Sequence, residues 1–169
     1  MSEMIFEGLH DAFNNHKSLG DEGTVKNRVN RCGDMALRAD SEAEEQITKT
    51  LTECASKNNI HFICKSEELG DQDINPNGLE TYFAVFDGLD GSSNYLKKGE
   101  WGYGTMFAIA KGENPSYEDF EIAGISMMEE NLIIIAKKGV GITVFDANTG
   151  EKHAIQPFNQ NEAYDHLKI

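Results

Sequence analysis

The first sixty residues carry apolar positions at the spacing of two helices. In residues 4–16 the apolar side chains recur at helical spacing and would form one apolar face of a helix. Residues 41–57 carry a second apolar stripe, preceded by Asp40 or Ser41 as the capping residue. The polar stretch between them, residues 19–30, has little periodicity and is predicted to be a loop. The core-facing positions of the two predicted helices are Ile5, Leu9, Ala12, Phe13, Ala43, Ile47, Leu51, Cys54 and Ala55.

Beyond residue 59 the pattern changes to short β-branched and aromatic runs. An acidic stretch rich in Asn, Pro and Gly, residues 69–78, separates the first two runs and is predicted to be a loop. Residues 82–86 and 103–110 are apolar at odd and even positions alike, which indicates strands covered on both faces. Two helices followed by strands predict an α+β fold, with the helices packed on a mainly antiparallel sheet. The predicted strands are residues 60–65, 82–87, 103–110, 120–128, 132–138, 142–146 and 152–156.

Composition and charge narrow the classes of function. The chain has 169 residues, the size of one domain. Its 15 basic and 29 acidic residues give a net charge of −14, which disfavours nucleic acid or an anionic membrane as a partner. Cys32, Cys54 and Cys64 have no CxxC spacing and are expected to be reduced thiols. Neither a signal peptide nor a membrane-spanning run is evident, so a cytoplasmic protein is expected.

The segment Asp-Gly-Leu-Asp-Gly-Ser-Ser-Asn, residues 87–94, is the most informative part of the chain. A hydrophobic strand leads into Asp87, and Asp90 follows after a tight turn, so that two carboxylates supply hard oxygen ligands at short range. Gly91 and Ser92 then resemble a helix N-terminus, whose free N–H groups attract phosphate. Metal-assisted phosphoryl chemistry requires this layout. By itself the segment also fits an ordinary Asp-Gly turn capped by serine.

Two further acidic positions are candidates for the same site. Glu67 and Glu68 directly follow the first predicted strand, and adjacent strands would carry Glu67 and Asp87 out at comparable heights. Asp40 is the third candidate, although helix capping explains its position when it is considered alone. Converging acids repel one another unless cations neutralise them or one takes up a proton. The sequence therefore predicts a divalent metal site.

Together these segments resemble the inositol monophosphatase/fructose-1,6-bisphosphatase superfamily. Glu67-Glu68, the string from Asp87 to Ser92, and the segment from Asp34 to Asp40 look like its three N-terminal motifs, in matching order and approximate spacing. The later stretch 138–150 resembles the hairpin that closes that domain. The resemblance covers most of the chain and implies the N-terminal domain of a sugar phosphatase.

The resemblance implies a set of metal ligands. Glu67, Asp87 and the carbonyl of Leu89 would hold a first Mg²⁺ ion. Asp87 would bridge to a second ion, which Asp90 binds. Two or three Mg²⁺ ions are implied, with Mn²⁺ as an alternative.

The same resemblance implies the phosphate site and the catalytic groups. The backbone N–H groups of Gly91 and Ser92 would bind the phosphate of the substrate. The Ser92 hydroxyl, paired with Asp40, would help to orient and deprotonate the water that attacks phosphorus. Asp40, Glu67 and Ser92 are therefore the implied catalytic residues.

Several features depart from the superfamily. Gly88 stands where the superfamily usually has proline, and glycine is expected to loosen the turn. Trp101 is followed by Gly102, so the Trp-Asp motif with which the second domain supplies another aspartate is missing. We therefore expect a metal- and phosphate-binding domain over residues 1–158. Residues 159–169 are expected to begin a linker to a second domain that the chain lacks.

Two hypotheses for function remain open. The first is metal-dependent hydrolysis of sugar or polyol phosphate monoesters, inositol monophosphate or fructose 1,6-bisphosphate, impaired if the second domain is needed. The second is a non-catalytic fragment that binds metal or phosphate. A small phosphorylated sugar or polyol is the expected partner. A partner chain, such as another copy in a homo-oligomer, is expected to cover the exposed C-terminal sheet edge.

Overall fold

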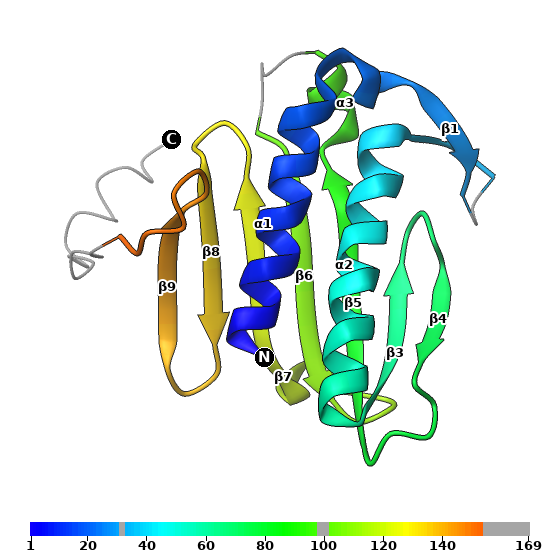
Figure 1. The fold of residues 1–169 in the computed structure, drawn as a ribbon, viewed down its shortest axis with the longest axis vertical. Coiled ribbons are helices and arrows are strands. Elements are labelled where there is room, and N and C mark those ends of the chain that lie inside the picture. The colour runs from blue at the N-terminus through cyan, green and yellow to red at the C-terminus, as the bar shows by residue number, and fades with distance from the viewer. Residues whose placement is uncertain (31–32, 98–101, 154–169) are drawn as a thin grey trace, which may run out of the picture.

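Two long helices lie side by side on one face of a seven-stranded sheet in the computed structural model, which describes residues 1–30, 33–97 and 102–153 (Figure 1). The sheet order is β4-β3-β5-β6-β7-β8-β9. Only β3 and β5 are parallel neighbours, and every other pair is antiparallel. This arrangement confirms the predicted α+β fold. In these ranges no helix combines the length and the apolarity that crossing a bilayer requires.

The elements follow one another closely along the chain. The α-helices are α1 (Ser2–Leu19), α2 (Arg38–Asn58) and α3 (Ser92–Leu96), and the 3₁₀ helices are η1 (Gly20–Thr24) and η2 (Tyr117–Asp119). A separate two-stranded sheet pairs β1 (Lys26–Val29) with β2 (Met35–Leu37). The strands of the main sheet are β3 (Ile60–Ser66), β4 (Asp71–Ile74), β5 (Glu80–Asp90), β6 (Gly104–Lys111), β7 (Phe120–Met127), β8 (Leu132–Lys137) and β9 (Gly141–Asp146).

The second helix begins earlier than its sequence pattern predicts. The chain passes directly from β2 into α2, with Leu37 at the N-cap and no side-chain cap. Asp40 and Ser41 therefore lie in the first turn of the helix, and the prediction that either caps it is wrong. The Ser41 hydroxyl donates to the Arg38 carbonyl instead, at 3.2 Å. The left-handed Asn59 (φ 54°) ends the helix.

Two segments that were predicted to be loops contain short strands. Residues 19–30 include η1 and β1, and residues 69–78 include β4. Both strands are polar and largely exposed, so no apolar run reveals them, and each forms because a neighbouring strand offers its backbone groups for pairing. Of the last predicted strand, Lys152 forms an isolated bridge with Phe145, and residues 154–156 lie outside the described residues. The expected linker at 159–169 lies outside them as well.

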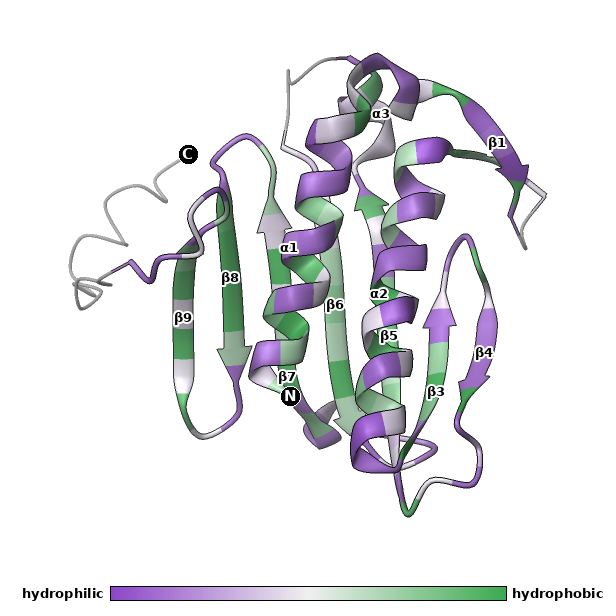
Figure 2. Ribbon diagram, viewed as in Figure 1, coloured by the Kyte–Doolittle hydropathy of each residue, from purple (hydrophilic) through white to green (hydrophobic). Residues whose placement is uncertain are grey.

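The hydrophobic core lies between the two helices and the sheet. Figure 2 shows hydrophilic residues on the sides of α1 and α2 that face away from the sheet, and hydrophobic residues along its strands. Phe107 packs edge-on against Phe86, with ring centroids 5.9 Å apart. A Cβ on Gly8 of α1 would meet the Phe107 ring at 3.4 Å. The main side chains of this core are Ile5, Leu9, Phe13, Ile47, Leu51, Phe62, Phe86, Phe107, Ile109 and Ile133.

The opposite face of the sheet is also apolar. Val85 is 37% exposed there and Met106 39%, and the two help to line a groove of about 500 Å³. Ala123, Ile125 and Ile134 continue the lining. The described residues thus cover one face of the central strands, whereas the sequence pattern predicted cover on both.

We predict that Phe107→Ala destabilises the fold by about 3–5 kcal/mol. The reason is that the ring is 1% exposed and its loss leaves a cavity beneath both helices. Urea unfolding measures the free energy. Leu79→Ala is the control, because Leu79 is 86% exposed and its truncation should change stability by no more than about 0.5 kcal/mol. Equal effects of the two substitutions would contradict this location of the core.

Candidate functional site

Two acidic turns lie at the same edge of the sheet: residues 67–69, which follow β3, and residues 87–90, an irregular stretch at the end of β5. The parallel strands β3 and β5 are in register, with Ser66 opposite Phe86. Glu67 follows Ser66 and Asp87 follows Phe86, so both acids stand at the same height, as the sequence predicted. Figure 1 shows that the N-terminal end of α2 lies at this edge too. The topology therefore brings Asp40 of that helix near both turns.

The carboxyl group of Asp87 lies within the field of other acids. Burial is the main cause that raises its pKa, to about 6, and the charges of Glu67 and Asp90 contribute. The Leu89 N–H donates to Asp87 Oδ1 at 2.9 Å, and this hydrogen bond lowers the pKa because it stabilises the ionised carboxylate. Three of the predicted metal ligands are thus electrostatically coupled.

Asp40 is the most perturbed acid at this edge. It is 4% exposed, and burial raises its pKa to about 8, with further contributions from the charges of Glu68 and Asp87. The Asn30 side chain donates to Glu68 Oε1 at 3.5 Å. In the described part of the chain, Asp40 Oδ1 and Glu68 Oε2 are buried without a hydrogen-bond partner. A proton shared between the Asp40 and Glu68 side chains, or a cation, would satisfy these two carboxylate oxygens.

The donor chemistry fits a divalent cation, but the side chains do not form a coordination sphere. Hard carboxylate and carbonyl oxygens are the ligands that Mg²⁺ takes. Among residues 1–30, 33–97 and 102–153, no three Asp, Glu, His or Cys groups are placed to hold one ion. The structure therefore brings Glu67, Asp87 and Asp90 to one edge, and their joint ligation of a metal stays a prediction.

The turn after Asp87 is packed firmly against α2. A Cβ on Gly88 would lie 2.3 Å from the Asp40 carbonyl oxygen, so no side chain fits at this position. The Gly88 carbonyl accepts hydrogen bonds from His16 Nε2 at 3.0 Å and from the Thr105 hydroxyl at 2.8 Å. Glycine thus permits a close approach between this backbone and α2, and the expected loosening of the turn stays a prediction.

The predicted phosphate site lies at the start of α3. Gly91 is the N-cap, with φ 85°, and α3 has only 5 residues. Its first amides have no acceptor within the helix, which leaves them available to a ligand. The Ser92 hydroxyl donates to the Leu89 carbonyl at 3.2 Å. In this structure its partner is therefore Leu89, and not Asp40 as the resemblance implied. Phosphate binding by Gly91 and Ser92 stays a prediction.

Sequence reasoning gave no site role to two buried residues. His16 is the first, and its Nε2 donates a hydrogen bond to the Gly88 carbonyl; burial lowers its pKa to about 4 and keeps it neutral. Glu44 is the second, and its carboxylate accepts hydrogen bonds from the turn after β3. Its position on the stripe of Ile47 and Leu51 was the available signal, because an acid on a buried stripe needs partners.

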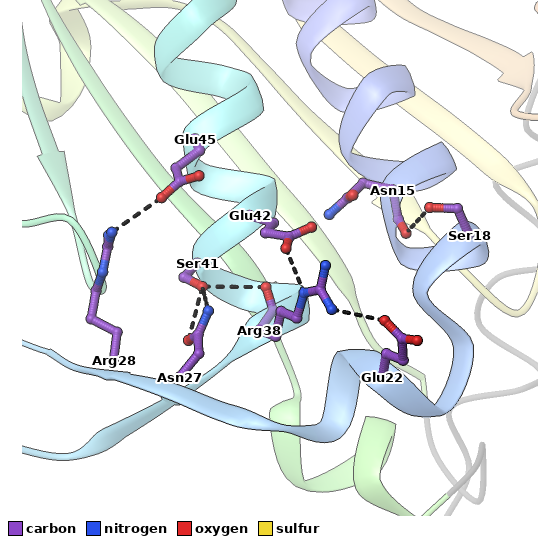
Figure 3. A network of polar contacts seen from close by, with 9 residues as sticks. All are labelled: Asn15, Ser18, Glu22, Asn27, Arg28, Arg38, Ser41, Glu42 and Glu45. Carbon is purple, nitrogen blue, oxygen red and sulfur yellow. Dashed lines mark hydrogen bonds and ion pairs between the residues drawn. The ribbon is translucent and has the colours of Figure 1, made fainter.

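Exposed polar contacts join η1 and β1, which lie between α1 and α2 in the chain, to the first turns of α2 (Figure 3). Arg38 donates to Glu42 at 2.6 Å and to Glu22 at 2.8 Å. Ion pairs at this exposure contribute little stability, and together with Arg28–Glu45 they join η1 and β1 to α2. The other contacts in this network are Arg28–Glu45, Asn27–Ser41 and Ser18–Asn15.

Known proteins identify the fold. Fructose-1,6-bisphosphatase class 1 of Campylobacter jejuni is 33% identical over 118 residues, which are 70% of this chain and 39% of that protein. In sequence and in fold the chain thus resembles the inositol monophosphatase/fructose-1,6-bisphosphatase superfamily. The resemblance found in the motifs is thereby confirmed. No family model matches the chain.

Solved structures of the superfamily share its architecture. The fructose-1,6-bisphosphatase of Leishmania major in holo form has a TM-score of 0.66 and 21% identity, covering 92% of this chain and 52% of that one. The IMPase of Thermotoga maritima has a TM-score of 0.59 and 16% identity, covering 90% and 52%. The chain thus spans about half the length of these superfamily members, and less of the Campylobacter protein.

We predict that Asp40→Asn stabilises the metal-free protein by roughly 2–4 kcal/mol at pH 8. The folded pKa of about 8 exceeds the ordinary pKa of 3.8 for an aspartate, so the native state binds an extra proton between these pH values and loses stability as the pH rises through them. The advantage of asparagine should vanish near pH 4. Urea unfolding in chelator at several pH values tests this, with exposed Asp11→Asn as control. A difference that does not change with pH would contradict it.

Proposed function

We propose that this chain carries the metal- and phosphate-binding site of a Mg²⁺-dependent phosphatase acting on sugar or polyol phosphate monoesters. The main support is the parallel register of β3 and β5, which delivers Glu67 and Asp87 to one edge beside Asp40. Acids that raise one another's pKa need a compensating cation to stay ionised together. The names of the relatives, fructose-1,6-bisphosphatase and IMPase, support the substrate class.

Each residue at this edge has a role in the proposal. Glu67, Asp87 and the Leu89 carbonyl would hold one Mg²⁺ ion, and Asp87 with Asp90 a second, with Mn²⁺ as an alternative. When bound, these ions would acidify water and neutralise phosphate charge. The local arrangement matters because the whole chain carries a net charge of −14, which repels phosphorylated substrates.

The remaining residues bind phosphate and handle a proton. The amides of Gly91 and Ser92 would take the phosphate oxygens, and the Ser92 hydroxyl, now bound to Leu89, would turn to the attacking water. Asp40 would accept the proton of that water. A pKa of about 8 means that Asp40 becomes a base near neutral pH only when the neighbouring negative charge is compensated.

The test is phosphate release from fructose 1,6-bisphosphate and from inositol monophosphate, in Mg²⁺ and in chelator. We expect release only with Mg²⁺, and a fall of roughly 100-fold or more in Asp87→Asn, because a carboxylate ligand is lost. Exposed Asp11→Asn should keep the activity of the parent.

Three outcomes decide between the hypotheses. Release in chelator, or undiminished release by folded Asp87→Asn, would refute the proposal. A folded parent that binds Mn²⁺ but never releases phosphate would instead establish the second hypothesis, a binding fragment without turnover.

A further inference from the structure

We propose that Glu44 is a positioning residue that holds the two acidic turns at the spacing the metal site needs. The inference rests on the proposed function and concerns a residue that the motifs do not contain. Glu44 is 0% exposed, so it cannot contact substrate or bulk solvent. Its role must therefore be exerted through the residues that it touches.

The carboxylate of Glu44 binds the turn after β3 through three backbone groups. Its Oε1 accepts the N–H groups of Glu67 at 3.1 Å and Glu68 at 3.2 Å, and its Oε2 accepts the N–H of Leu69 at 2.8 Å. Hydrogen bonds to an ionised acceptor are stronger and more directional than neutral ones. The backbone that carries the Glu67 side chain is thus held by a residue 23 positions earlier in the chain.

The stem of the same side chain lies against the irregular end of β5, where the register with β6 shifts between Asp87 and Asp90. A Cβ on Gly88 would come within 3.0 Å of Glu44 Cγ, which shows how closely that backbone approaches α2. Gly88 is next to Asp87. One side chain therefore contacts both acidic turns, with its carboxylate on the first and its methylene groups on the second.

This arrangement sets the separation of Glu67 and Asp87. The pairing between β3 and β5 ends at Ser66 and Phe86, whereas β6 still pairs with Asp87 and Asp90. The turn after β3 could therefore otherwise move relative to the end of β5. A neutral amide at position 44 would keep the shape but present an NH₂ group to backbone N–H donors, so at least one of the three hydrogen bonds would be lost. The turn after β3 would then be free to shift, and the ligand oxygens would shift with it.

A comparison of Glu44→Gln with Glu45→Gln tests the inference. Glu45 is the matched control, since it lies next in the helix and pairs with Arg28 at the surface, both side chains being well exposed. The first measurement is hydrogen exchange at the amides of residues 67–69. We expect faster exchange in Glu44→Gln and unchanged exchange in Glu45→Gln.

The second measurement is Mn²⁺ binding by calorimetry, and the third is the Mg²⁺ concentration for half-maximal phosphate release. We expect the Mn²⁺ dissociation constant and the half-maximal Mg²⁺ concentration each to rise about tenfold in Glu44→Gln, as for other residues that orient metal ligands. The KM for the sugar phosphate should stay unchanged, because the phosphate amides belong to a different turn. Glu45→Gln should match the parent in every measurement.

The outcomes separate this inference from the proposed function. If Glu44→Gln folds and exchanges faster but binds Mn²⁺ as the parent does, Glu44 is only structural and the inference is overturned. If the parent binds Mn²⁺ but releases no phosphate, the proposed function fails while the Mn²⁺ comparison still decides the role of Glu44. A parent that binds no Mn²⁺ overturns both. If Glu44→Gln does not fold, Glu44→Asp replaces it as the test, because aspartate keeps the charge but shortens the side chain. We then expect weaker Mn²⁺ binding than in the parent, and unchanged binding would overturn the inference.

Discussion

Negative charge held at low solvent exposure is the constraint on which this structure depends. The acids at the edge of the sheet meet it in different ways. Glu44 receives three backbone N–H groups, and Asp87 receives one from Leu89. Asp40 has a buried oxygen without a partner in the described residues, and its pKa of about 8 shows that the protein retains a proton there at neutral pH.

The hydrophobic core determines where this charge is concentrated. Packing of α2 across β3 and β5 places the N-terminal end of the helix beside the two turns, and the glycine at position 88 lets the backbones touch. His16 of α1 donates a hydrogen bond to the Gly88 carbonyl. The apolar contacts thus contribute most of the stability, while a few buried polar contacts orient the site.

The resemblance to the superfamily agrees with these separate roles of the apolar and the polar contacts. The architecture persists at 16–21% identity in the solved structures, because packing tolerates many apolar sequences of suitable volume. If the proposed metal site is correct, the acidic turns have less freedom, since each would need a carboxylate at the end of its strand. The chain spans about half of those structures, so the proposed phosphatase activity is a property to be measured on this chain itself.

The sequence by itself determined the two helices, the principal strands and the acids at the strand ends, because these follow from the period of apolar residues and from turn chemistry. It also predicted correctly that Glu67 and Asp87 leave the sheet at one height. The polar strands β1 and β4 had no such signal, since pairing with a neighbour creates them. Only the tertiary structure decided that Asp40 lies inside the first turn, that Ser92 binds Leu89, and that Glu44 holds the turn after β3. These are contacts between side chains and the backbones of other segments, and no local pattern encodes where those backbones will lie.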